Sequence, residues 1–260
     1  MRILFIGDVN GKVGRRMAAA HLPALRRERG AGLCVVNGEN AAGGFGITPD
    51  MTEELFRAGA DVITSGNHIW NRKEAHDLLL REPRLLRPSN YPPGVPGKGM
   101  FVASSLEGPV AVINLMGRVF MPPAECPFRE ADRLLDALPP EVRMVVVDIH
   151  AEATSEKVAL GWHLDGRVSA VVGTHTHVQT ADERVLPQGT AYLSDAGMTG
   201  PSDSVIGIRT SIAVGKFLTG VPVRLEAAEG AGMLNGALVE VDSATGRAAS
   251  IERILIREGS

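Results

Sequence analysis

The second half of the chain contains Arg167-Val-Ser-Ala-Val-Val-Gly-Thr-His-Thr-His177, and we derive the fold outward from this stretch. Its apolar, β-branched part predicts a buried strand that ends at Gly173. His175 and His177 follow at once, so two imidazoles are expected where the strand ends. Ligands of open α/β sheets bind beyond the carboxyl ends of the strands, and imidazole is the commonest metal-binding side chain. The pair therefore indicates either metal ligands or two solvated loop histidines.

Four other apolar segments are expected to end in polar side chains of the same kind. The strand over residues 2–6 leads to Asp8, that over 33–36 to Glu39 and Asn40, that over 62–64 to Asn67, and that over 144–149 to His150. A single case would mean little, because polar residues are common where a strand becomes a loop. Five strands with carboxylate, carboxamide or imidazole at the same end favour a shared metal site.

The chain has 260 residues, of which 44% are hydrophobic, and this predicts one α/β domain over residues 1–260. A net charge of -3 gives no basic stripe, so stable binding of a nucleic-acid polymer is not expected, whereas a small phosphorylated ligand fits. The chain has only two cysteines, Cys34 and Cys126, which do not form the pattern of a disulfide-stabilised protein, and this favours a reducing compartment. We find no signal peptide and no run long enough to cross a membrane, so the expected location is the cytoplasm.

The segments between these strands predict a β-α-β series with right-handed crossovers. Helices are expected over 15–29 (bending or restarting at Pro23), 49–58, 73–82, 129–138, 154–164 and 211–218. Further strands are expected over 100–103, 110–115, 190–193, 223–227, 237–241 and 251–256, with local antiparallel pairing among the last four. The predicted architecture is two packed sheets with helices outside. The apolar segment 116–123 predicts either a loop over the site or a packed turn.

Seven candidate ligands gather at the strand ends, which is too many for one tetrahedral ion. They are Asp8, Glu39, Asn40, Asn67, His150, His175 and His177. Such a set suits two ions roughly 3.5–4 Å apart, a spacing at which two metals hold the attacking and leaving oxygens of a displacement at phosphorus. Oxygen and nitrogen ligands without thiolate favour Mn, Fe or Zn over Ca. We expect two metal ions per chain, with Fe or Mn preferred and Zn as the alternative.

These motifs resemble those of the calcineurin-like metallophosphoesterases. Gly7-Asp8, Gly66-Asn67-His68, His150 and Gly173-Thr-His175-Thr-His177 carry this resemblance. The stretches Asn37-Gly-Glu39-Asn40-Ala-Ala-Gly-Gly44, His150-Ala-Glu-Ala-Thr-Ser-Glu-Lys157 and Ser194-Asp195-Ala-Gly-Met-Thr-Gly200 resemble the bacterial YmdB-like branch. The resemblance covers most of the chain and implies the four-layer α/β/β/α sandwich of that family.

The resemblance also implies how the ligands divide. It places Asp8, Asn40 and His177 on one metal and Asn67, His150 and His175 on the other, with Glu39 between them. The wider family begins with D-x-H, whereas this chain has Asp8-Val9-Asn10. In the YmdB-like branch Asn40 takes the place of the missing histidine, so Asn10 is expected to be a loop residue.

The resemblance gives His68 a separate role. It implies that His68 faces the substrate and protonates or stabilises the departing oxygen, for which an aqueous pKa near 6.5 is suitable. The alternative is a histidine that only orients the phosphate. A metal-bridging hydroxide would attack phosphorus, and the implied substrates are small phosphodiesters, namely 2′,3′-cyclic and 3′,5′-cyclic AMP.

Alternatives remain for the function and for several neighbouring residues. The chain could instead be a phosphomonoesterase or phosphoprotein phosphatase, or a regulatory, RNA-associated protein that retains a metal site, and a homo-oligomer stays open. Asp195 could hold a histidine ring through its other nitrogen. Two groups of side chains have a second interpretation. Glu152, Glu156 and Lys157 could support the site or form a solvated helix start, and Phe45, Trp70, Phe120 and Tyr192 could stack on a base or pack in the core.

Overall fold

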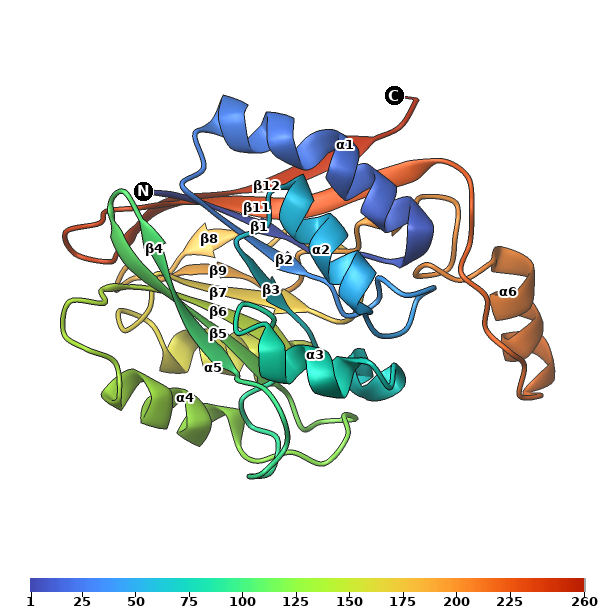
Figure 1. Ribbon diagram of the computed structural model, residues 1–260, viewed down its shortest axis with the longest axis horizontal. Helices are drawn as coiled ribbons and strands as arrows, with labels where there is room; N and C mark the ends of the chain where they lie inside the picture. The colour runs from blue at the N-terminus through green and yellow to red at the C-terminus, as the bar shows by residue number, and fades with distance from the viewer. Residues whose placement is uncertain (260) are drawn as a thin grey trace.

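The computed structural model describes residues 1–259 and contains two six-stranded β-sheets that pack face to face (Figure 1). The strand order is β10-β11-β1-β2-β3 in the first sheet, where β12 also pairs with β11, and β4-β5-β6-β7-β9-β8 in the second. Helices cover the outer face of each sheet. This architecture confirms the predicted α/β class with two packed sheets flanked by helices.

The first sheet combines parallel strands from the amino-terminal half with antiparallel strands from the other end of the chain. Its strands are β1 (Arg2–Ile6), β2 (Leu33–Asn37), β3 (Val62–Thr64), β10 (Gly200–Pro201), β11 (Gly232–Val241) and β12 (Ala248–Arg257). The helices α1 (Gly11–Arg29) and α2 (Pro49–Ala58) lie on its outer face. Side chains alternate along β1, so Leu4 and Ile6 pack with these helices.

The second sheet is mainly parallel. Its strands are β4 (Met100–Ser105), β5 (Gly108–Met116), β6 (Met144–His150), β7 (Ala170–Thr174), β8 (Arg184–Val185) and β9 (Ala191–Leu193). The helices α4 (Pro127–Asp136) and α5 (Thr154–His163) cover its outer face. Both sheets contribute to one buried cluster, in which Ile3 and Phe5 meet Val112 and Val146. The two sheets therefore share a core, and a single domain over residues 1–260 stays a prediction.

The register of the parallel strands sets where the site forms. His150 at the end of β6 pairs with Thr174 at the end of β7, and Asn37 at the end of β2 pairs with Thr64 at the end of β3. The carboxyl ends of these strands therefore lie level within each sheet. Because the sheets pack face to face, side chains after both sets of strands meet at one edge of the sandwich.

Three predicted elements differ from the structure. Helix α1 begins at Gly11 and continues through Pro23, because one missing N–H does not end a helix packed along a sheet. The predicted helix over 73–82 is α3, which is shorter (Ala75–Arg81), and an unpredicted 3₁₀ turn, η1 (Asn67–Asn71), precedes it. Strand β9 pairs with β7 in parallel, whereas β11 and β12 are antiparallel as predicted.

The predicted strand over 223–227 is wrong. This segment follows α6 (Thr210–Thr219), a helix that projects from the body of the molecule (right side of Figure 1). Among residues 1–259, no strand pairs with this segment, and its sheet-like contact is one isolated bridge between Ile208 and Ala227. No helix within residues 1–259 has both the length and the hydropathy that a transmembrane segment requires.

Candidate active site

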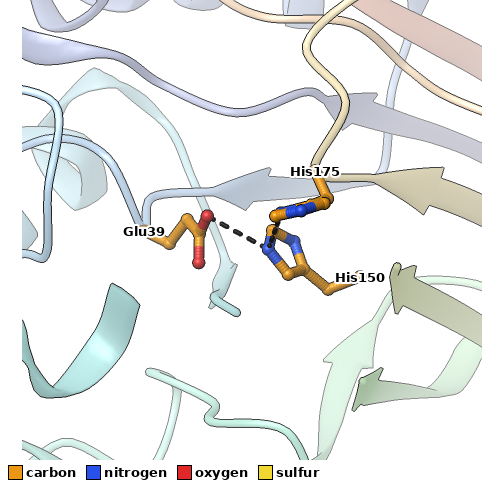
Figure 2. A group of neighbouring side chains, drawn as sticks. All are labelled: Glu39, His150 and His175. Atoms are coloured by element: carbon orange, nitrogen blue, oxygen red, sulfur yellow. Dashed lines mark hydrogen bonds and ion pairs between the residues drawn. The ribbon is translucent and has the colours of Figure 1, made fainter. Parts of the chain in front are cut away.

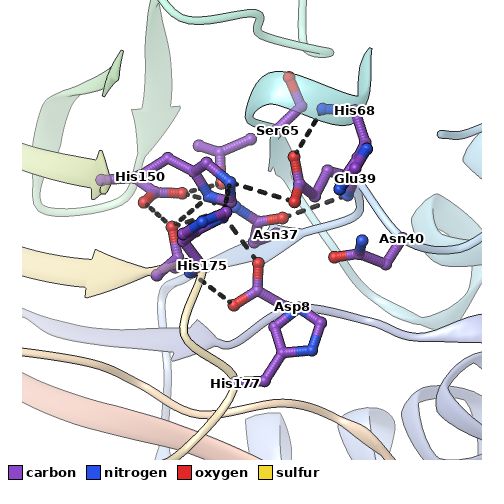
Figure 3. A network of polar contacts seen from close by, with 12 residues as sticks. Asp8, Asn37, Glu39, Asn40, Ser65, His68, His150, His175 and His177 are labelled. Carbon is purple, nitrogen blue, oxygen red and sulfur yellow. Dashed lines mark hydrogen bonds and ion pairs between the residues drawn. The ribbon is translucent and has the colours of Figure 1, made fainter. Parts of the chain in front are cut away.

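The structure brings the seven predicted ligands together at the strand ends; Figure 3 labels all of them except Asn67, whose Oδ1 lies 3.0 Å from His150 Nε2. Asp8 follows β1, Glu39 and Asn40 follow β2, Asn67 opens η1, His150 ends β6, and His175 and His177 follow β7. The Asp8, Glu39 and His150 side chains are fully buried. Polar groups from five separate strand ends therefore share one water-poor site.

Glu39, His150 and His175 form the tightest group (Figure 2). One ligand atom from each lies within 4.8 Å of the others. The His150 Nε2 atom is 3.1 Å from Glu39 Oε1, 3.0 Å from His175 Nδ1 and 3.0 Å from Asn67 Oδ1. These four donors are close enough to surround a single ion.

The other three residues lie beside this group. Asp8 Oδ2 accepts the backbone N–H of His175 at 3.2 Å. The Asn40 side-chain Nδ2 donates to the Gly44 carbonyl at 2.9 Å, so the Asn40 Oδ1 atom points away from Gly44. The His177 Nδ1 atom lies 2.9 Å from the Ile206 carbonyl, so this nitrogen is the donor and Nε2 stays available as an acceptor.

Several buried oxygens of the site have no hydrogen-bond partner among the described residues. They are Asp8 Oδ1, Glu39 Oε1, Asn40 Oδ1 and Asn10 Oδ1; for Glu39 Oε1 the His150 ring is near, at 3.1 Å, but not aligned for a hydrogen bond. Folded proteins leave few buried polar atoms unpaired, and each such atom points to a missing partner. Buried carboxylate oxygens together with imidazole nitrogens fit metal ions.

Burial and the neighbouring side chains set the protonation states of the site. Burial raises the pKa of Asp8 to about 7, against the opposing effect of His177 and His150. Burial alone would lower the pKa of His150, but the carboxylates of Glu39 and Asp8 raise it to about 9. Burial and the neighbouring His150 lower the pKa of His175 to about 3. Protons therefore occupy positions that metal ions would take over.

A buried network below the site orients His150. Thr174 Oγ1 donates to Asp148 Oδ1 at 2.7 Å, so the same hydroxyl oxygen accepts from His150 Nδ1 at 2.9 Å. When His150 is neutral, the lone pair of its Nε2 therefore points into the site. Asn37 donates to Asp148 at 3.0 Å and so links the two sheets. The role of Asp148 was not predicted from sequence. The feature that could have indicated it is a carboxylate inside the otherwise apolar β6 strand.

The hypothesis that Asp195 holds a histidine ring is wrong. Its carboxylate accepts from Lys157 Nζ at 2.8 Å, from the Thr176 hydroxyl at 2.6 Å and from the Gly197 N–H at 2.8 Å. Lys157 is 2% exposed, so it is no solvated helix start. Asp195 therefore shapes the loop between His175 and His177 instead of contacting their rings.

That loop is held in an unfavourable backbone conformation. His175 has φ 100° and His177 has φ 66°, both in the region that favours glycine. Such residues cost about 1–3 kcal/mol each and persist where surrounding contacts fix them. Two hydrogen bonds provide those contacts: the Thr176 N–H donates to Asp195, and the His175 N–H donates to Asp8.

His68 lines a pocket that opens over the ligand cluster. The pocket has a volume of about 240 Å³ and also includes Asn10, which was expected to be a loop residue. The His68 N–H donates to Glu39 Oε2 at 3.2 Å, and its ring lies edge-on to Phe45 with 5.0 Å between centroids. A larger pocket, of about 460 Å³, lies beside Arg87 and contains none of the seven predicted ligands.

Two acidic residues after β6 have different surroundings. Glu156 is buried and accepts the Arg118 N–H at 3.0 Å, which anchors the segment 116–123. Glu152 is half exposed, and its Oε2 lies 3.1 Å from His175 Nε2. Phe120 is 90% exposed and does not line the 240 Å³ pocket, so a covering role for this segment stays a prediction.

The chain also matches a known protein family over nearly its whole length. The model of the family described as YmdB-like protein matches residues 4–254. The chain belongs to the YmdB-like family. This confirms the resemblance found in the sequence, and the match spans both sheets and every predicted ligand.

Relatives of this YmdB-like chain align with it over nearly their whole length. The chain is 49% identical over 258 residues to a 2′,3′-cyclic-nucleotide 2′-phosphodiesterase of Bacillus subtilis (strain 168), covering 99% of this chain and 98% of the relative. A crystal structure of a hypothetical protein from Thermus thermophilus has a TM-score of 0.94 at 43% identity, covering 99% of this chain and 100% of that one. A crystal structure described as a novel phosphatase from Mycoplasma pneumoniae has a TM-score of 0.93 at 35% identity. The match covers 99% of this chain and 93% of that one.

Proposed function

We propose that this chain is a metal-dependent phosphodiesterase that hydrolyses cyclic nucleotides, with 2′,3′-cyclic AMP as the main substrate and 3′,5′-cyclic AMP as a second. One observation carries the proposal. Buried carboxylate and amide oxygens without partners converge with three imidazoles beneath an open pocket. The activity named for the Bacillus subtilis relative, at 49% identity, supports the choice of substrate.

The proposed ligands divide between two metal ions. Asp8, Asn40 and His177 would hold one ion, Asn67, His150 and His175 the other, and Glu39 would bridge them. The close contacts of His150 with Glu39, Asn67 and His175 support the second set. We propose Fe or Mn, with Zn as the alternative. When bound, two such ions lower the pKa of a water molecule and neutralise charge on the phosphate oxygens.

His68 is the proposed general acid. Its ring lines the pocket, while its N–H bond to Glu39 fixes the start of η1 beside the ligands. Hydroxide, formed when the water releases a proton to solvent, would attack phosphorus and form one P–O bond, and the bond to a ribose oxygen would break. His68 donates its proton to that departing oxygen, so the product is a nucleoside monophosphate.

The pocket also indicates the kind of partner. A volume of about 240 Å³ is suited to a single nucleotide, and the net charge of -3 provides no track for a polymer backbone. We propose a small phosphodiester as the partner. The two free cysteines are consistent with our proposal of a cytoplasmic location, and a homo-oligomer stays a prediction.

A second candidate is hydrolysis of phosphomonoesters, because the Mycoplasma pneumoniae structure is described as a phosphatase. The test is to compare kcat/KM of the metal-loaded protein for 2′,3′-cyclic AMP, 3′-AMP and p-nitrophenyl phosphate. We expect the cyclic diester to exceed both monoesters at least tenfold and chelation to abolish turnover. Preference for the monoesters would contradict the phosphodiesterase assignment.

A further inference from the structure

A strained turn forms one wall of the pocket. Val205 and Ile208 exchange both backbone hydrogen bonds, each at 2.9 Å, which closes a two-residue turn. Its central residues, Ile206 and Gly207, have φ 46° and φ 96°. Two positive φ values are typical of a type I′ turn, which favours asparagine and glycine. A β-branched residue such as isoleucine is an outlier there.

Core packing does not account for isoleucine at position 206. The side chain is 51% exposed, so burial provides little of the stability that would offset the backbone strain. Strained residues cluster at functional sites, where another requirement holds them in place. The strain therefore indicates that an apolar side chain is needed at this position for a reason other than folding.

Ile206 connects the turn to the site in two ways. Its carbonyl accepts the His177 Nδ1–H at 2.9 Å and so orients that imidazole. Ile206 also lines the same pocket as His68. The carbonyl contact depends on the backbone alone and would be the same for any residue, so it does not explain why the side chain is isoleucine.

The pocket has a polar and an apolar side. The predicted ligands form the polar side, where the phosphate would bind. The apolar side is formed by Phe45, Ile206, Ile208 and Leu225. Aromatic rings bind to apolar surfaces of this kind with little need for directed hydrogen bonds. A nucleotide offers both parts, a phosphate and an aromatic base.

We propose that Ile206 is a specificity-determining residue, whose side chain holds the base of the nucleotide substrate against the apolar wall that includes Phe45. This rests on the proposed cyclic-nucleotide activity. The contact recognises an aromatic base as such, because the apolar side chains of the wall have no polar atom with which to distinguish one base from another. Substrates without a base should consequently lose affinity.

The test is the variant Ile206→Asn, since asparagine adopts positive φ readily, keeps the backbone carbonyl for His177 and removes the apolar side chain. The measurement is kcat/KM of the metal-loaded protein for 2′,3′-cyclic AMP and for base-free ribose 2,3-cyclic phosphate. Wild type should prefer the nucleotide. In the variant this preference should fall about tenfold, mainly through KM. The Tm should rise by a few degrees as the strain is relieved.

The ratio of kcat/KM for the two substrates distinguishes a lost base contact from a general loss of activity. A loss of metal lowers both rates alike and leaves the ratio unchanged. The matched control is Val221→Asn, at a residue that is 56% exposed and does not line the pocket, and its ratio should equal that of wild type. Ile206→Gly provides the same comparison if asparagine disturbs folding.

Three results would overturn the inference. If wild type had equal kcat/KM for both substrates, the base would make no favourable contact with the protein, while the proposed phosphodiesterase function would stand. An unchanged ratio in Ile206→Asn would show that the strained side chain does not contact the base. Absence of turnover with either cyclic phosphate would reject the proposed function together with the inference.

Discussion

Thr174 shows how much a single hydroxyl contributes to the site without contacting the substrate. It donates to Asp148 and accepts from His150 Nδ1. Thr174→Val keeps the shape but removes the hydrogen bonds of two buried atoms, Asp148 Oδ1 and His150 Nδ1, so we expect a loss of about 1–3 kcal/mol in the free energy of unfolding. Metal affinity should fall about 10–100-fold, as it does when the group that orients a ligand is removed.

Thermal unfolding and metal titration of Thr174→Val measure these effects. Thr219→Val is the matched control, because Thr219 is exposed at the end of α6. Its stability should stay within about 0.5 kcal/mol of wild type. Unchanged metal affinity in Thr174→Val would contradict the role given to the Asp148–Thr174 network.

The raised pKa values of Asp8 and His150 predict how metal binding depends on pH. In the metal-free protein Asp8 has a pKa of about 7 and His150 of about 9, so both retain protons near neutrality. Folding raises both values above those of the unfolded chain, and the metal-free fold consequently loses stability as pH rises through them. Metal binding displaces these protons, so its affinity should increase from about pH 6 to about pH 9.

Calorimetric titration of metal at about pH 7, in two buffers with different ionisation enthalpies, gives the number of protons released. We expect net release, because Asp8 and His150 must both give up protons to act as ligands. Binding heats that do not depend on the buffer would be incompatible with these protonation states.

The gathering of the seven candidate ligands was predictable from sequence, since polar residues directly after apolar strands are a local pattern. Asp148 and Ile206 were not, for a physical reason. Their roles depend on contacts with residues distant in the chain, such as Asn37 for Asp148 and His177 for Ile206. In the sequence, Asp148 looks like an interruption of an apolar strand, and Ile206 looks like an ordinary loop residue.

At the scale of elements, the approach of η1 to the ligands depends on Gly66. A Cβ built at this position would lie 2.1 Å from His150 Cδ2 and 2.4 Å from Glu39 Oε2. Gly66 has φ -154° and ψ -143°, and the space beside it is too small for a Cβ atom. Gly66→Ala should therefore displace both ligands and lower turnover at least about 100-fold.

Metal content and kcat of Gly66→Ala check this expectation. Gly215→Ala, in helix α6, is the control, because a Cβ there would meet no atom within 4 Å. Its turnover should equal that of wild type, and its stability should rise by up to about 1 kcal/mol. Full activity of Gly66→Ala would mean that the close packing around η1 is not required.

Strand and helix positions were predictable wherever alternation or capping signals were local. The segment 223–227 misled because Val-Arg-Leu alternation is typical of a strand, yet a strand also needs a neighbour to pair with. Similarly, Pro23 suggested a break in α1, but the packing of the helix against the first sheet outweighs one lost hydrogen bond. Tertiary contacts decided both cases.

At the scale of the whole molecule, the site exists only where the two sheets meet. The first sheet supplies the carboxylates Asp8 and Glu39, and the second supplies the imidazoles His150 and His175. The hydrogen bond between Asn37 and Asp148 joins the two halves at 3.0 Å. Apolar patterning predicted two packed sheets, whereas the meeting of carboxylates with imidazoles was implied by the resemblance, and the link between Asn37 and Asp148 required the structure.

The most direct test of the two-metal account is metal analysis of the purified protein together with 2′,3′-cyclic AMP turnover, for wild type, Asn67→Ala and His68→Ala. We predict about two metals per chain in wild type. Turnover should be lost in both variants, with metal reduced only in Asn67→Ala. One metal or none in wild type, without turnover in Mn, Fe or Zn, would contradict the account.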